Sequence, residues 1–204
     1  MSLQMGFTKK LELLTEKVKS VDMHPSEPWV ASALYNGSLT IYNYNTQSLV
    51  KKIEISDAPL RCCKFVPRKQ WIVATGDKMC IWVYNYNSLE KVHTVEGHKD
   101  YVRYLDLHPT MPYVISCSDD MTVVLWDIDK NWEKVATFEG HSHYVMMGKW
   151  NPKDTNIFAT CSLDKTISFW RVSLESDKSQ TPNKPYFTLT GHERGDTLLF
   201  VTSG

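Results

Sequence analysis

Residues 97–127 read GHKDYVRYLDLHPTMPYVISCSDDMTVVLWD, and three landmarks in this stretch recur along the chain. The first is a residue followed by proline, with spacings of 42, 42 and 43 residues, at His24-Pro25, Val66-Pro67, His108-Pro109 and Asn151-Pro152. The second is an aromatic dipeptide, with spacings of 42, 42 and 44, at Tyr42-Asn43, Tyr84-Asn85, Trp126-Asp127 and Trp170-Arg171. The third is Gly-His, at Gly97, Gly140 and Gly191. Because the landmarks advance in step, the chain is a repeat of about 42 residues.

Short apolar runs lie at fixed places within each repeat. One set follows the proline landmark, at Val30–Leu34, Trp71–Thr75, Tyr113–Ser116 and Ile157–Thr160. A second set follows turns rich in Asn, Gly or Asp, at Leu39–Tyr42, Cys80–Tyr84, Thr122–Trp126 and Thr166–Trp170. Paired short strands joined by such turns are hairpins, and no window has a convincing helical period. Each repeat therefore predicts a small antiparallel sheet that must stack on its neighbours to bury both faces.

A period of this length with Gly-His and Trp-Asp signatures is typical of WD repeats. We therefore predict an all-β fold, an incomplete WD-repeat β-propeller with about four blades and the start of a fifth. The blades are expected at residues 17–54, 59–96, 100–139 and 143–190, between an N-terminal segment (1–16) and a tail (191–204). Lys10–Leu14 is expected to form a strand of the kind that latches a closed propeller, and Leu174–Pro185 a surface loop. An open arc exposes its first and last blades, which predicts a marginal monomer that tends to associate.

Composition narrows the function further. The formal net charge is zero, so no global field attracts nucleic acid. The five cysteines include no CxxC pair and are expected to be small buried residues in a reducing cytosol. His141-Ser142-His143 lacks a further metal ligand nearby, so no metal site and no cofactor are predicted. No apolar run has the length of a membrane span or signal peptide.

The third and fourth repeats carry the same four side chains in the same phase. They are His98, Ser116, Asp120 and Trp126, and then His141, Thr160, Asp164 and Trp170, and they resemble the structural tetrad of WD repeats. We predict two buried chains in which Asp accepts from His, His meets the hydroxyl and the hydroxyl meets the indole N–H. A catalytic Ser-His-Asp interpretation is rejected because the set recurs in the phase of the repeat. The first two repeats lack the set and are expected to depend on packing of Trp29, Tyr42, Trp71 and Tyr84.

Several segments extend beyond the generic repeat signature. They are KVKSVDMHPSEPW (17–29), LYNG (34–37), FVPRKQW (65–71), YNYN (84–87), DYVR (100–103), SDDM (118–121), GHSHYVM (140–146), NPKD (151–154) and FTLTGHERG (187–195). In one register from about Lys9 to Gly195, these segments resemble the N-terminal propeller of the coatomer β-prime subunit family, part of the COPI vesicle coat.

The resemblance implies a non-catalytic module that binds C-terminal dilysine sorting signals of membrane cargo during retrieval from Golgi to endoplasmic reticulum. It implies that the peptide carboxylate is held by Lys17, Lys19 and Arg61. Asp100 and Asp119 would receive one ammonium, with Tyr35 packed against the peptide stem. Lys17 stands where the family often has arginine. A lysine ammonium there would contact the carboxylate as a single charge, without the two parallel hydrogen bonds that a guanidinium makes. An acidic contact for the second lysine is expected from the fifth blade or beyond.

The implied partners are cytosolic cargo tails and other coatomer subunits. The implied location is the cytoplasm and, peripherally through the coat, Golgi membranes and COPI-coated vesicles. A generic WD scaffold for another complex and a non-functional truncated product stay open as alternatives. An enzyme is disfavoured because no nucleophile–base set, phosphate loop or metal cluster stands apart from the repeat pattern.

Overall fold

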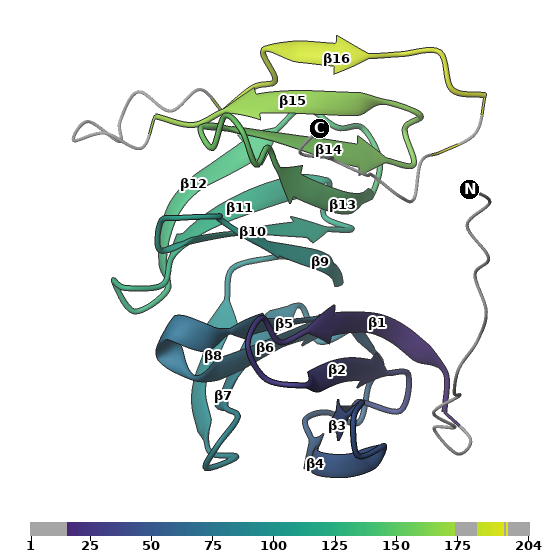
Figure 1. Ribbon diagram of the computed structural model, residues 1–204. Coiled ribbons are helices and arrows are strands. Elements are labelled where there is room, and N and C mark those ends of the chain that lie inside the picture. Colours follow the sequence, from purple (N-terminus) through teal and green to yellow (C-terminus); the bar gives the residue numbers. More distant parts are fainter. Residues whose placement is uncertain (1–15, 174–182, 194, 196–204) are drawn as a thin grey trace, which may run out of the picture.

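The computed structural model describes residues 16–173, 183–193 and 195, and these residues form four antiparallel sheets of four strands each (Figure 1). Blade 1 contains β1 (Val18–Met23), β2 (Trp29–Leu34), β3 (Ser38–Asn43) and β4 (Ser48–Glu54). Blade 2 contains β5 (Leu60–Val66), β6 (Trp71–Gly76), β7 (Cys80–Asn85) and β8 (Lys91–Glu96). Blade 3 contains β9 (Val102–Leu107), β10 (Tyr113–Ser118), β11 (Thr122–Asp127) and β12 (Glu133–Glu139). Blade 4 contains β13 (Val145–Trp150), β14 (Ile157–Ser162), β15 (Ile167–Arg171) and β16 (Phe187–Leu189).

Each blade is a meander in which consecutive strands pair, so the hairpins predicted from the apolar runs are confirmed. The only helical element among the described residues is a short 3-10 turn, η1 (Pro67–Lys69), between β5 and β6. The all-β, incomplete WD-propeller prediction is therefore confirmed. The expected strand at Lys10–Leu14 and most of both the expected loop and the tail lie outside the described residues. Within the described part of the chain, no helix could cross a membrane.

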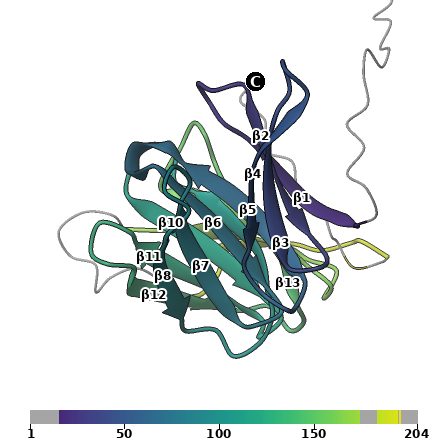
Figure 2. The same ribbon diagram turned by 90° about the horizontal axis from the view of Figure 1, so that it is seen from below.

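The hydrophobic core lies between blades. Figure 1 shows the sheets following one another in chain order, and Figure 2 shows β1 to β4 as a layer at one side of the molecule. One core cluster joins blades 1 and 2, a second joins blades 2 and 3, and a third joins blades 3 and 4. All five cysteines are buried and unpaired, in agreement with their interpretation as small apolar residues. Burial raises the pKa of Cys117, which keeps this thiol protonated at neutral pH.

The first strands are joined by ion pairs from one repeat position. This position carries Asp22, Lys64, Asp106 and Lys149 in blades 1 to 4. Lys64 Nζ lies 2.7 Å from Asp22 Oδ1, and Lys149 Nζ lies 2.8 Å from Asp106 Oδ1. The second oxygen of each carboxylate accepts a backbone N–H from the next blade, that of Phe65 or Trp150. These contacts bind blade 1 to blade 2 and blade 3 to blade 4.

Two proline landmarks also connect blades, through their histidines. His108 Nδ1 accepts the backbone N–H groups of Thr110 (3.2 Å) and Met111 (2.9 Å). Its Nε2–H therefore donates to the carbonyl of Thr155 in blade 4, at 2.9 Å. His24 accepts the N–H of Glu27 in the same way and lies against Phe65 and Tyr86 of blade 2. The sequence pattern predicted a turn here, and the structure adds a contact between blades.

We expect acid to weaken the His108 contact. Burial lowers the pKa of His108 below 6.5, and the Thr155 carbonyl opposes this only in part. The neutral ring is therefore favoured in the folded state, so its stabilisation is present above pH 6.5 and is lost as the pH falls through the folded pKa. His108→Asn is a suitable comparison because it keeps an acceptor for the N–H groups of the turn. At the equivalent turn of blade 4, Asn151 Oδ1 accepts the N–H groups of Lys153 and Asp154.

Urea unfolding at about pH 7.5 and about pH 5.5 measures this effect. From the higher to the lower pH, the free energy of unfolding of the wild type should drop by roughly 1 kcal/mol more than that of the His108→Asn variant. At the higher pH the variant should itself be less stable by about 1 kcal/mol, because it loses the hydrogen bond to Thr155. Equal pH dependence of the two proteins would contradict the assignment.

Candidate functional site

The same backbone hydrogen bond closes one end of every blade. The residue after the second strand donates its N–H to the carbonyl of the residue before the first strand, in the pairs Tyr35–Lys17 (2.9 Å), Asp77–Pro59 (3.1 Å), Asp119–Tyr101 (2.9 Å) and Leu163–Tyr144 (3.1 Å). These residues therefore lie at one end of the propeller, blade beside blade. The six residues implied by the resemblance lie in these turns or beside them, namely Lys17, Lys19, Tyr35, Arg61, Asp100 and Asp119.

Tyr35 lies between two of the predicted cations. The residue is 45% exposed. Lys17 Nζ lies 5.5 Å and Arg61 Cζ 5.8 Å from the ring centroid, within the range of cation–π contacts. The structure thus brings Lys17, Tyr35 and Arg61 together across blades 1 and 2, and it leaves an aromatic face open to solvent.

Arg61 is already engaged by a residue that the sequence reasoning missed. Its Nε and Nη2 donate to the two carboxylate oxygens of Asp77 at 2.6 and 2.7 Å. Both side chains are largely buried, with 16% and 11% exposure. Because a guanidinium has five N–H donors, Arg61 keeps donors for a further acceptor, but its fork is already bound to Asp77.

Asp119 has the same arrangement one repeat later. Arg103 donates to both of its oxygens, with Nε at 2.7 Å from Oδ1, and the Asp119 side chain is only 3% exposed. This hydrogen bonding, together with the Asp119 charge, raises the pKa of Arg103, and the charge of Asp77 adds to the effect. Arg103 also lies 5.8 and 5.9 Å from the rings of Tyr101 and Tyr144. Sequence reasoning missed Arg103, although it follows Arg61 by one repeat length.

Blade 1 breaks this pairing. Lys19 occupies the position of Arg61 and Arg103, and Tyr35 occupies that of Asp77 and Asp119. Blade 1 therefore offers no carboxylate at the turn, and within the described ranges neither Lys17 nor Lys19 forms an ion pair. The spacing of the repeat could have shown this difference.

Asp100 supplies charge of the opposite sign in blade 3. It is half-buried, and its Oδ1 accepts the backbone N–H of Tyr101 at 2.7 Å. No cation among the described side chains pairs with it, whereas Arg61–Asp77 and Arg103–Asp119 are internally neutral. This end of the propeller therefore offers uncompensated positive charge at blade 1, two neutral pairs and uncompensated negative charge at blade 3. Such a surface suits a ligand with separated charges of both signs.

The two tetrads belong to the scaffold. His98 Nδ1 lies 2.7 Å from Asp120 Oδ2 and its Nε2 lies 2.6 Å from Ser116 Oγ, to which Trp126 Nε1 donates at 2.8 Å. The fourth blade repeats the set, with contacts of 2.7, 2.8 and 2.8 Å among His141, Asp164, Thr160 and Trp170. The structure places the eight residues in the predicted order of contacts. Burial by itself would raise the pKa of Asp120, but hydrogen bonding and the charge of His98 outweigh it and hold this pKa below its usual range.

Comparison with known proteins adds to this geometry. Residues 9–43, 89–127 and 132–171 match the family described as WD domain, G-beta repeat. Over all 204 residues, the chain is 56% identical to coatomer subunit beta'-2 of Oryza sativa subsp. japonica and 50% identical to coatomer subunit beta' of Homo sapiens and of Rattus norvegicus. The chain spans 22% of the length of these relatives. The resemblance to coatomer β-prime subunits is therefore confirmed over the whole chain.

Proposed function

Since this chain belongs to the WD domain, G-beta repeat family, we propose that it is a recognition module whose ligand is a C-terminal dilysine tail of membrane cargo. WD-repeat and coatomer β-prime proteins are non-enzymatic scaffolds, and we propose that this chain likewise acts by binding. The coatomer resemblance supports a role in retrieval from Golgi to endoplasmic reticulum, at the cytoplasmic face of COPI-coated membranes. Other coatomer subunits are its proposed partners.

The observation that carries this proposal is the order of charges at one propeller end. Among the described residues, Lys17 and Lys19 have no carboxylate partner, and Asp100 has no cationic partner. A dilysine tail carries its carboxylate at the chain end and its ammonium groups a few residues before it. The carboxylate would lie at blade 1 and an ammonium near Asp100, with the peptide stem on the exposed ring of Tyr35.

Arg61 and Asp119 keep the roles that the resemblance implied, but each acts while already paired with a residue of opposite charge. Arg61 would add its remaining N–H donors to the carboxylate site while Asp77 holds the side chain in place. Asp119 would act on an ammonium through the free lone pairs of its oxygens, beside Arg103. We therefore assign the stronger attraction to Lys17, Lys19 and Asp100, whose charges are uncompensated.

Titration calorimetry with a peptide ending in Lys-Lys-x-x tests the proposal. We expect amidation of its C-terminus to weaken binding roughly ten-fold or more, because a charge-assisted contact is lost. Lys17→Ala should weaken binding of the free acid by roughly three- to ten-fold and leave the weak binding of the amidated peptide almost unchanged.

The matched control is Lys91→Ala, which removes another exposed lysine from the outer strand β8. This variant should bind the free acid as the wild type does. Equal affinity for the two peptides would instead favour a generic scaffold that recognises basic segments.

A further inference from the structure

A pocket of about 420 Å³ opens on blade 3 beside the proposed ammonium site. Lys99 lines this pocket and directly precedes Asp100 in the chain. Asp120 lines it as well and directly follows Asp119. From there the pocket extends along the outer strand of the blade, β12, whose contribution to the wall is Lys134, Thr137 and Glu139. The pocket therefore borders the candidate site and continues away from it.

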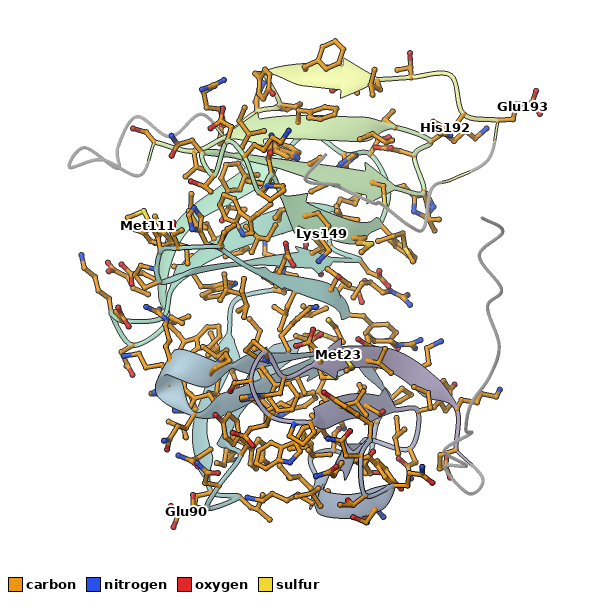
Figure 3. All side chains as sticks on the ribbon, viewed as in Figure 1. Met23, Glu90, Met111, Lys149, His192 and Glu193 are labelled. Carbon is orange, nitrogen blue, oxygen red and sulfur yellow. The ribbon has the colours of Figure 1, made fainter. Side chains whose placement is uncertain are left out.

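The pocket opens at the end of the propeller that carries the candidate site. Gly97 and Gly140, from the first two Gly-His landmarks, both line it. Figure 3 labels His192, from the third landmark, at this end of the molecule and Met111 at the other end. A peptide whose lysine reaches Asp100 would thus have the pocket directly beside it.

Two lysines of the pocket are uncompensated. Neither Lys99 nor Lys134 forms an ion pair with a residue that the structure describes. Asp120 does not neutralise them, because its oxygens already accept from His98 Nδ1 (2.7 Å), from the Lys99 backbone N–H and from the N–H and hydroxyl of Thr122. The remaining carboxylate of the lining is Glu139, at the opposite end of β12 from Lys134. Two free cations and one free anion favour an anionic ligand.

Blade 2 has the same positions without the same free charge. There Asp57 and Lys78 occupy the positions of Lys99 and Asp120. Lys78 Nζ lies 3.0 Å from Asp57 Oδ1, so these two charges neutralise each other. In blade 3 the tetrad histidine, His98, takes the carboxylate instead, at 2.7 Å. The tetrad therefore leaves the lysine of blade 3 available to a ligand.

We propose that this pocket binds acidic side chains of the cargo tail that precede its dilysine pair, an inference that rests on the proposed function. With the tail carboxylate at blade 1 and a lysine at Asp100, the preceding residues would continue into the pocket, which begins at Lys99. Lys99 binds one acidic side chain and Lys134 another further along β12, and the Thr137 hydroxyl is an additional donor. The pocket thus selects among dilysine tails by the charge of the residues before the lysines.

Titration calorimetry with two matched peptides tests this selection. Both carry a free C-terminus and an acetylated N-terminus; one is Glu-Glu-Glu-Lys-Lys-Ala-Ala and the other is Gln-Gln-Gln-Lys-Lys-Ala-Ala. Glutamine keeps the shape of glutamate and removes its charge. The wild type is expected to bind the glutamate peptide roughly three- to ten-fold more tightly than the glutamine peptide.

Variants of the pocket should change this ratio of affinities in opposite directions. Lys99→Ala and Lys134→Ala should each reduce it, because an attracting charge is lost. Glu139→Gln should increase it, because a repelling charge is lost. The matched control is Lys91→Ala, since Lys91 occupies the position of Lys134 in blade 2. This control should keep the wild-type ratio, and circular dichroism checks that every variant is folded.

Three results would overturn the proposal: equal affinity of the wild type for the two peptides, an unchanged ratio in the Lys99→Ala/Lys134→Ala double variant, or a lower ratio in Glu139→Gln. An NMR titration separates the pocket from the proposed function. Its probe is a Glu-Glu-Glu peptide blocked at both ends, which has neither lysines nor a terminal carboxylate. It should shift the amide signals of Gly97 and Thr137 whether or not dilysine peptides bind. If a dilysine peptide binds while this probe causes no shift, the pocket is refuted and the proposed function stands.

Discussion

Thr160→Val is expected to lower the free energy of unfolding by roughly 2–5 kcal/mol. Valine matches threonine in shape, so the substitution removes a hydroxyl without opening a cavity. Thr160 Oγ1 accepts from Trp170 Nε1 and contacts His141 Nε2, both at 2.8 Å. Thr160 and Trp170 are fully buried, so no water can replace the lost partner. The substitution therefore leaves an indole N–H and an imidazole nitrogen unsatisfied in the core of blade 4.

Thr75→Val in β6 provides the control. Thr75 is also fully buried, but its Oγ1 has no hydrogen-bond partner. Removing that hydroxyl should leave stability unchanged or raise it, because an unsatisfied polar atom is replaced by a methyl group. Denaturant unfolding of the two variants, followed by tryptophan fluorescence, compares them. Similar losses in both variants would show that the contacts of the tetrad contribute little.

Gly37→Ala is expected to cost roughly 3 kcal/mol or more. Gly37 has a φ of +86°, which disfavours any side chain, and a Cβ there would lie 1.9 Å from the carbonyl oxygen of Ser56. The nearby Ala58 oxygen would lie at 2.8 Å, so the clash is with backbone and cannot be relieved by a rotamer change. The Gly37 carbonyl also accepts the N–H groups of Ile55 and Ser56, which ties the β2–β3 turn to the end of β4.

Gly191→Ala separates the clash from the backbone conformation. Gly191 also has a positive φ, +125°, but a Cβ there would meet no atom within 4 Å. We expect this variant to lose about 1 kcal/mol or less in thermal or denaturant unfolding. Gly37 lies two residues after Tyr35, so Gly37→Ala should also weaken binding of the dilysine peptide. A Gly37→Ala protein as stable as Gly191→Ala would contradict the steric argument.

Much of the scaffold could be predicted because its signals are local or recur at a fixed phase. The apolar runs and the turns between them predicted strands β2, β3, β6, β7, β10, β11, β14 and β15. The tetrads could be anticipated because a buried indole, hydroxyl, imidazole and carboxylate satisfy one another only in one order of contacts. His24 and His108 were read only as landmarks, because their contacts with the next blade depend on packing between residues far apart in sequence.

The candidate site shows where prediction from sequence ended. The six residues that the resemblance implied do lie at one end of the propeller, since each stands near the start of a first strand or in the turn after a second strand. Their ionic partners were not anticipated: Asp77 holds Arg61 and Arg103 holds Asp119. Each pair spans 16 residues, from the first strand to the turn after the second, and only the strand register brings the two ends together. The repeat also places Lys19 opposite Tyr35, which removes the carboxylate in blade 1.

The sequence by itself determined the repeat length, the order of strands, the stacking of sheets and the two tetrads, because hydrogen bonding and burial within one repeat depend on local spacing. Only the tertiary structure decided which charges at the propeller end are compensated and which apolar positions lack a neighbour. Those properties depend on the side chain that the next blade presents. Identical positions therefore differ in burial, as Leu105 and Val21 do, according to whether a blade covers them.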